Sequence, residues 1–142
     1  MFRKIVLAYN GPEYTAAALR QAADLARLCS AELHLLGVVA TMGSVALAEA
    51  YGAMDFFGME REAIEQALEM AIADLDENMS VHTRIREGDP ADQIAAYAHE
   101  IGADLVVIGH SNKGFLSRLF EGSTGAKLIR NLPCNLLVST TG

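Results

Sequence analysis

Apolar positions follow two different periods along this chain, and the two periods alternate. Short, almost unbroken apolar runs such as 5–9 and 104–108 are typical of parallel strands that are buried on both faces. Between such runs lie longer segments whose apolar residues recur every three or four positions, as in amphipathic helices. The predicted strands are 5–9, 32–39, 81–87, 104–108 and 135–139, and the predicted helices are 13–28, 60–77, 91–101 and 123–131.

The alternation of strands and helices predicts an α/β fold with three layers, in which helices cover both faces of a parallel sheet. In such sheets ligands bind beyond the carboxyl ends of the strands, where the winding direction reverses. The two most apolar strands, 5–9 and 104–108, are the natural neighbours of that point, and glycine-containing turns follow them at 10–11 and 109–110. We therefore expect these two turns to face one another across a cleft.

The chain is expected to form a single domain over residues 1–142, because its length suits one core and it contains no evident linker. The least regular stretch is about 41–58, where glycines are interspersed with methionines and phenylalanines. We interpret it as a flexible insertion, in preference to a lid or a partner surface.

Composition narrows the classes of function. The sequence is 51% apolar and 20% charged, which favours a compact folded domain. Its net charge of −7 argues against a nucleic-acid binder, because such proteins need a basic face. No apolar run is long enough for a membrane span. The two cysteines form no disulfide framework and no signal peptide is evident, so we expect a cytoplasmic protein.

A glycine-punctuated loop, 109–123, separates an apolar strand from a predicted helix. Backbone N–H groups in such a loop, together with the first turn of the helix, can hold a phosphate. The loop lacks the Gly-Lys-Ser/Thr ending of a P-loop, and the first strand lacks a dinucleotide fingerprint. A purely structural turn, in which Ser123 only caps the helix, is the alternative interpretation.

The same loop resembles the signature Gly-x2-Gly-x9-Gly-Ser/Thr of the universal stress protein family. Gly109 matches the first position, Gly122 the third and Ser123 the terminal hydroxyl, whereas Asn112 stands at the second position. Segments 88–91 and 132–138 are also similar to the family's sequences, so that the resemblance covers the whole chain.

The resemblance implies a Rossmann-like, adenine nucleotide alpha hydrolase-like fold with sheet order 3-2-1-4-5. It also implies binding of ATP or AMP, with Mg²⁺ or Mn²⁺ held through the phosphates, and homodimers that pair through the last strand, about 135–139. Asn10 would lie near the adenosine, Val38 would contact adenine through its backbone, and the loop would hold ribose and phosphates. The residues implied to contact the nucleotide are Ala8, Asn10, Val38, Ile108, Gly109, Asn112, Gly122, Ser123 and Thr124.

Two positions depart from the pattern of family members that bind ATP. Asn10 replaces an aspartate and therefore offers a neutral acceptor to the ribose. Asn112 replaces a glycine; asparagine tolerates the left-handed backbone region, but its side chain could intrude on the phosphates. Pro12 also removes an N–H from the turn after the first strand.

Two hypotheses follow. In the first, the chain is an adenine-nucleotide-binding, homodimeric stress-response or regulatory module with an unknown protein partner. In the second, it is a nucleotide-independent dimerisation or adaptor protein with a degenerate loop.

Catalytic and metal-binding residues are not assigned from the sequence. No nucleophile or general base can be assembled from the cleft residues, which leaves at most slow ATP hydrolysis. His34, His82 and His99 lack metal-ligand spacing. Asp89 is expected to be the N-cap of the helix 91–101 rather than half of an acid pair.

Overall fold

The computed structural model describes residues 1–9, 12–40, 53–110 and 123–140. Five parallel strands form one sheet in the order β3-β2-β1-β4-β5, which confirms the expected order 3-2-1-4-5. The strands are β1 (Lys4–Ala8), β2 (Glu32–Ala40), β3 (Val81–Gly88), β4 (Leu105–His110) and β5 (Asn135–Thr140). The helices are α1 (Pro12–Cys29), α3 (Ala53–Ala73), α4 (Pro90–Ile101) and α5 (Ser123–Asn131).

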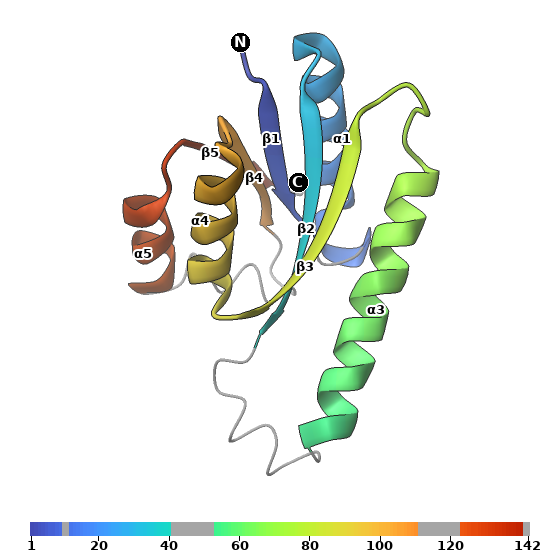
Figure 1. The fold of residues 1–142 in the computed structure, drawn as a ribbon, viewed down its shortest axis with the longest axis vertical. Helices are drawn as coiled ribbons and strands as arrows, with labels where there is room; N and C mark the ends of the chain where they lie inside the picture. The colour runs from blue at the N-terminus through green and yellow to red at the C-terminus, as the bar shows by residue number, and fades with distance from the viewer. Residues whose placement is uncertain (10–11, 41–52, 111–122, 141–142) are drawn as a thin grey trace.

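The helices cover both faces of the sheet. Figure 1 shows α4 and α5 on one side of the strands and α1 and α3 on the other. The strands at the centre, β1 and β4, pair directly with one another. The predicted three-layer architecture and the predicted neighbours at the reversal point are therefore confirmed.

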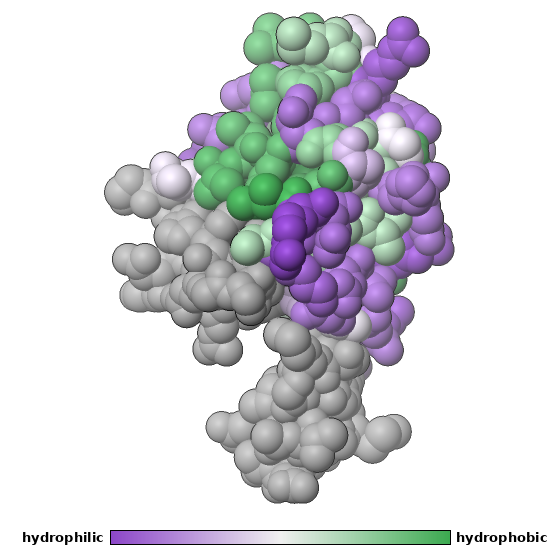
Figure 2. Space-filling model, turned by 90° about the vertical axis from the view of Figure 1, so that its left-hand side faces the viewer, coloured by the Kyte–Doolittle hydropathy of each residue, from purple (hydrophilic) through white to green (hydrophobic). Residues whose placement is uncertain are grey.

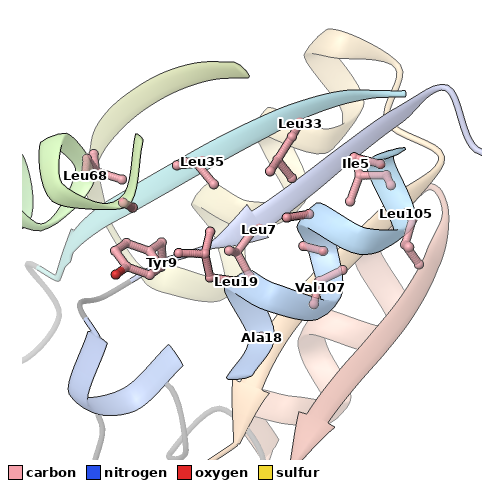
Figure 3. Packing of buried hydrophobic residues seen from close by; sticks show 14 of the residues in the cluster. Ile5, Leu7, Tyr9, Ala18, Leu19, Leu33, Leu35, Leu68, Leu105 and Val107 are labelled. Carbon is pink, nitrogen blue, oxygen red and sulfur yellow. The ribbon is translucent and has the colours of Figure 1, made fainter. Parts of the chain in front are cut away.

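Side chains of the central strands alternate between the two faces. On β1, Ile5 and Leu7 pack on the side of α1 and α3, together with Leu105 and Val107 of β4 (Figure 3). The intervening residues, such as Val6, pack on the side of α4 and α5. Because helices cover both faces, positions 5–8 of β1 and 105–108 of β4 are all apolar, and this explains why their sequences show no alternation.

The helix α3 begins earlier than the sequence predicted. It starts at Ala53 rather than at Glu60, so the last part of the predicted insertion 41–58 is helical, and it ends at Ala73 rather than at Glu77. Gly58 was interpreted as a mark of irregular structure, but a single glycine in a long helix costs only about 1 kcal/mol and does not end it. The first part of that insertion, 41–52, lies outside the described residues.

The start of α4 has the predicted cap. The side chain of Asp89 accepts a hydrogen bond from the backbone N–H of Asp92 at 3.1 Å, and Pro90 occupies the first turn. At the other end, Gly102 adopts φ = 68°, a left-handed conformation that glycine adopts at little cost. Asp89 and Gly102 therefore fix where α4 begins and ends.

Replacing Gly37 with alanine is expected to destabilise the protein by about 1–3 kcal/mol, because small-to-large changes in a packed core force their neighbours to shift. Gly37 lies on β2 beneath α3, and a Cβ atom built there would stand 2.3 Å from Cγ2 of Ile64. Urea unfolding measures the change. Leucine lacks the Cγ2 branch, so Ile64→Leu should recover part of the loss in a double mutant. Fully additive losses would contradict this explanation.

Replacing Asp104 with asparagine is expected to lower the melting temperature at pH 7. Asp104 Oδ2 accepts the backbone N–H groups of Arg3 at 2.6 Å and Lys4 at 3.0 Å, and these bonds lower the pKa of Asp104 below its ordinary value of 3.8. A carboxylate with a lowered pKa in the folded state stabilises that state above its unfolded pKa and stops doing so as the pH falls through its folded pKa.

The deficit of Asp104→Asn should therefore be full at pH 7 and should shrink as the pH is lowered below about 3.8. Thermal unfolding followed by circular dichroism across this pH range measures it. Glu62→Gln, which removes one negative charge from an exposed position of α3, serves as the control. A deficit that is independent of pH would contradict the role assigned to the carboxylate.

Candidate functional site

Three of the predicted contact residues lie on one face at the carboxyl ends of neighbouring strands. Ala8 of β1 pairs with Ile108 of β4, and both belong to the core cluster that also contains Val38 of β2. Their exposed fractions are 1%, 0% and 2%, respectively. Their side chains are therefore part of the core, and what they can offer a ligand at this edge is their backbone.

Strand β2 continues past the end of its pairing with β1. The β1–β2 register ends at the pair Ala8–Leu36, followed by one bond from Tyr9 N–H to Leu36 O of 2.8 Å. On its other side β2 remains paired with β3 as far as Ala40, and Val38 pairs there with Arg86. The edge of Val38 that faces β1 thus lies beyond the last described β1–β2 pair, where a planar base could meet its backbone.

The end of β4 continues into the predicted phosphate loop. Gly109 is buried and pairs with Ser139 of β5. Ser139 is 2% exposed, and its hydroxyl has no hydrogen-bond partner within the described part of the chain. The sequence analysis overlooked Ser139 because one serine in an apolar strand gives no pattern to recognise.

The helix α5 begins at Ser123, as predicted, and Thr124 is its second residue. A helix start at this position directs unpaired backbone N–H groups toward the carboxyl edge of the sheet. The predicted contact residues Asn10, Asn112 and Gly122 lie outside the described residues. The basic residues Lys113 and Arg118 of the same segment also lie outside the described residues.

The two acidic residues at the start of α4 are engaged by a lysine. Lys127 Nζ lies 2.8 Å from Asp92 Oδ1 and 3.3 Å from Asp89 Oδ2. These bonds, first the one to Asp92 and then the one to Asp89, raise the pKa of Lys127. The cluster joins α5 to α4, and Asp89 serves as the predicted N-cap.

A pocket of about 420 Å³ lies on the opposite face of the sheet, between α1 and the turn that follows α3. Tyr9, Leu19 and Leu75 are among its lining residues. Burial is the main cause that raises the pKa of Tyr9, so its hydroxyl stays protonated at neutral pH. Among the described residues, neither Ala8 nor Ile108 lines this pocket, and their side chains pack on the other face of the sheet.

At the amino end of the sheet the structure brings together three side chains that the sequence does not connect. His34 of β2 pairs with His82 of β3, and Glu32 of β2 lies beside them. Candidate ligand atoms of the three residues lie within 4.8 Å of one another. The spacing of these histidines in the sequence does not predict a metal site, but pairing between strands can place residues together at any spacing.

The sequence of the whole chain matches a known family. The model of the universal stress protein family matches residues 1–139. The chain belongs to this family. A universal stress protein of Methanocaldococcus jannaschii is 30% identical over 140 residues, which are 97% of this chain and 82% of the relative.

Solved structures of universal stress proteins have the same fold. One, in complex with cAMP, is 20% identical and has a TM-score of 0.66, with 99% of this chain and 98% of the other covered. Another, from Archaeoglobus fulgidus in complex with dAMP, is 18% identical and has a TM-score of 0.62, with 97% of each chain covered.

No helix in the described ranges is long and apolar enough to cross a membrane. Cys29 and Cys134 are both free thiols. Cys134 is partly buried, and this burial raises the pKa of its thiol, which makes the thiolate scarce at neutral pH and the residue a poor nucleophile.

Proposed function

We propose that this universal stress protein binds an adenine nucleotide, ATP or AMP, at the carboxyl ends of β1, β2 and β4. The observation that carries the proposal is the offset between β1 and β2. The β1–β2 register ends at Ala8–Leu36, whereas β2 continues to Ala40. The backbone of Val38 thus lies beyond the last described β1–β2 pair, and an adenine ring would meet its β1 side there, at the reversal point where α/β sheets bind their ligands.

The phosphates would lie on the segment between Gly109 and Thr124. Support comes from the position of this segment, which leaves the end of β4 and enters α5 at Ser123. It also comes from the spacing of Gly109, Gly122 and Ser123 in the sequence. Mg²⁺ or Mn²⁺ would be held by phosphate oxygens and water, which needs no dedicated protein ligands.

The relatives support an adenine nucleotide in particular. Two universal stress proteins of this fold were solved in complex with cAMP and dAMP. Both ligands carry an adenine base and a single phosphate group, so base and phosphate contacts suffice to explain the proposed recognition. The described residues at this edge, Ala8, Val38 and Ile108, are apolar and buried, which suits a binding module better than an acid–base catalyst.

We propose a regulatory role in the cytoplasm, in which the bound nucleotide changes how the protein binds a partner protein. Free cysteines rather than a disulfide framework support a reducing compartment. The regulatory role is suggested by Ala8, Val38 and Ile108, which offer backbone groups rather than acidic or basic side chains to a nucleotide. A nucleotide that is bound but not consumed can act only by favouring one conformation.

Nucleotide-stripped protein is expected to bind ATP and AMP in titration calorimetry. Gly122→Val should abolish binding, because a branched side chain would stand where the phosphates approach the backbone. Asn112→Gly should leave the affinity unchanged or raise it by up to about a hundredfold, the equivalent of about 3 kcal/mol.

Gly102→Asn is a matched glycine replacement at the far end of α4, where asparagine tolerates the left-handed backbone, and it should bind like the parent. If folded parent protein released no heat with millimolar nucleotide, the chain would instead be a nucleotide-independent adaptor. Weaker binding by Asn112→Gly would mean that the asparagine itself contacts the ligand.

We further propose that two copies pair through the edge strand β5. Val138 is 36% exposed, and on α5 Ile129 is 62% exposed. Figure 2, which views the side of the molecule on which α5 and β5 lie, shows an apolar area bordered by polar residues. The outer edge of β5 offers backbone groups that a second copy can pair with.

Val138→Lys is expected to convert a dimer into a monomer, because a charge would have to be buried between the two edge strands. Light scattering after size-exclusion chromatography measures the mass, and circular dichroism checks the fold. Met70→Lys introduces the same charge at a position on α3 that is 62% exposed, and it should remain dimeric. A parent protein that is monomeric at high micromolar concentration would refute the pairing.

A further inference from the structure

We propose that Glu32, His34 and His82 bind a zinc ion at the amino-terminal edge of the sheet. Glu32 is the first residue of β2, and His82 is the second residue of β3. The register pairs His34 with His82, so all three side chains lie on the face of the sheet that α4 covers. This edge is opposite to the proposed nucleotide site, and the proposal does not depend on nucleotide binding.

His34 provides a nitrogen that lacks a partner. The residue is 8% exposed, and its Nε2 is buried with no hydrogen-bond partner among the described residues. Its other nitrogen, Nδ1, lies 3.0 Å from the hydroxyl of Tyr97 on α4. When Nδ1–H donates to that hydroxyl, Nε2 carries the lone pair, and zinc-bound histidines usually have their second nitrogen held in this way.

Glu32 provides a carboxylate that is already oriented. Its Oε1 lies 3.3 Å from Nε2 of His82, and its Oε2 lies 4.0 Å from Nζ of Lys4. Lys4 in turn donates a hydrogen bond to the backbone oxygen of Ile101 at 3.0 Å. Oε2 therefore faces Lys4, which is itself held in place, and Oε1 faces the histidines. Oε1 is thus free to act as a metal ligand.

His82 can complete the set by a small rotation. Its ring stacks on that of His34 with centroids 4.6 Å apart and planes inclined by 18°. The side chain is 49% exposed, and its Nε2 lies 3.3 Å from Ser80 Oγ as well as from Glu32. Tetrahedral zinc with bonds of about 2.0–2.2 Å needs ligand atoms roughly 3.3–3.5 Å apart. The carboxylate–imidazole distance already meets this requirement.

Residues around the three proposed ligands also hold the site in place. Arg86 of β3 makes two hydrogen bonds of 2.8 Å to Glu100 of α4, and its guanidinium lies 5.6 Å from the centre of the Tyr97 ring. These contacts hold Tyr97 where its hydroxyl meets His34. Such contacts beyond the ligands orient the imidazole and raise metal affinity.

The environment of the site favours a neutral His34 and a moderate affinity for zinc. Burial is the main cause that lowers the pKa of His34, and His82 adds to it, so the ring is neutral at pH 7, the form that binds metals. Lys4 and Arg84 are cationic neighbours on the same face. Two imidazoles and one carboxylate, with water in the fourth position, are ligands that zinc accepts. Because these two cations repel the zinc ion, we expect a Kd for zinc in the micromolar rather than the nanomolar range.

The test uses the full chain without a histidine tag. Zinc is titrated in competition with a chromophoric chelator, and Co²⁺ replaces zinc to report tetrahedral geometry through its visible absorption. We expect one ion per chain, and changed imidazole NMR signals of His34 and His82. His82→Gln and Glu32→Gln, both at positions that are not buried, should each weaken binding by at least about tenfold, and Tyr97→Phe by about tenfold through the loss of the contact to His34.

His99→Gln is the matched control, because His99 is an exposed histidine on α4 outside the cluster, and it should bind zinc like the parent. The proposal would be overturned if the parent bound no zinc at micromolar concentration. It would also be overturned if His82→Gln retained the parent affinity, or if His99→Gln lost affinity as much as His82→Gln. Nucleotide titrations of His82→Gln should match the parent, so the two sites can be judged separately.

Discussion

The central strands β1 and β4 lie side by side in the middle of the sheet, and helices must bury both of their faces. Ile5, Val6 and Leu7 are each completely buried, and so are Val106 and Val107. Burial on two faces stabilises the protein by about 25 cal/mol for each Å² of apolar surface removed from water. It also requires helices on both sides, and right-handed crossovers then limit the possible orders of the strands.

Because helices cover both faces, polar functional groups can come together at the two ends of the strands. These are called here the carboxyl edge and the amino edge of the sheet. At the carboxyl edge Ala8 of β1 and Ile108 of β4 are apolar and buried, so that these two residues can offer backbone groups to a ligand. At the amino edge the outer strands β2 and β3 supply Glu32, His34 and His82. The arrangement at the carboxyl edge suits a flat base and phosphates, whereas the arrangement at the amino edge suits a cation.

Helix α4 connects the two edges. Its first turn carries Asp89, which caps the helix near the proposed nucleotide site and meets Lys127 of α5. Toward its other end, Tyr97 reaches His34, and Glu100 holds Arg86. The same helix buries Ile94 completely in the core. One amphipathic helix therefore supplies core packing along its middle and polar support at both ends.

Most of the fold was determined by the sequence itself, because apolar period and turn residues are local properties. The strands, the start of α5 at Ser123 and the cap at Asp89 were predicted within one or two residues, and the strand order followed from the family resemblance. The start of α3 was missed, since a single glycine such as Gly58 does not end a long helix. The predicted contacts of Asn10, Asn112 and Gly122 remain predictions.

Only the tertiary structure decided which distant residues meet. The register of β2 against β1 places Val38 beyond the last described β1–β2 pair, and no local pattern encodes where one strand extends past its neighbour. The register of β2 against β3 pairs His34 with His82, and α4 adds Tyr97. Such meetings depend on packing between elements far apart in the chain, whereas sequence periodicity reports only which face of each element is buried.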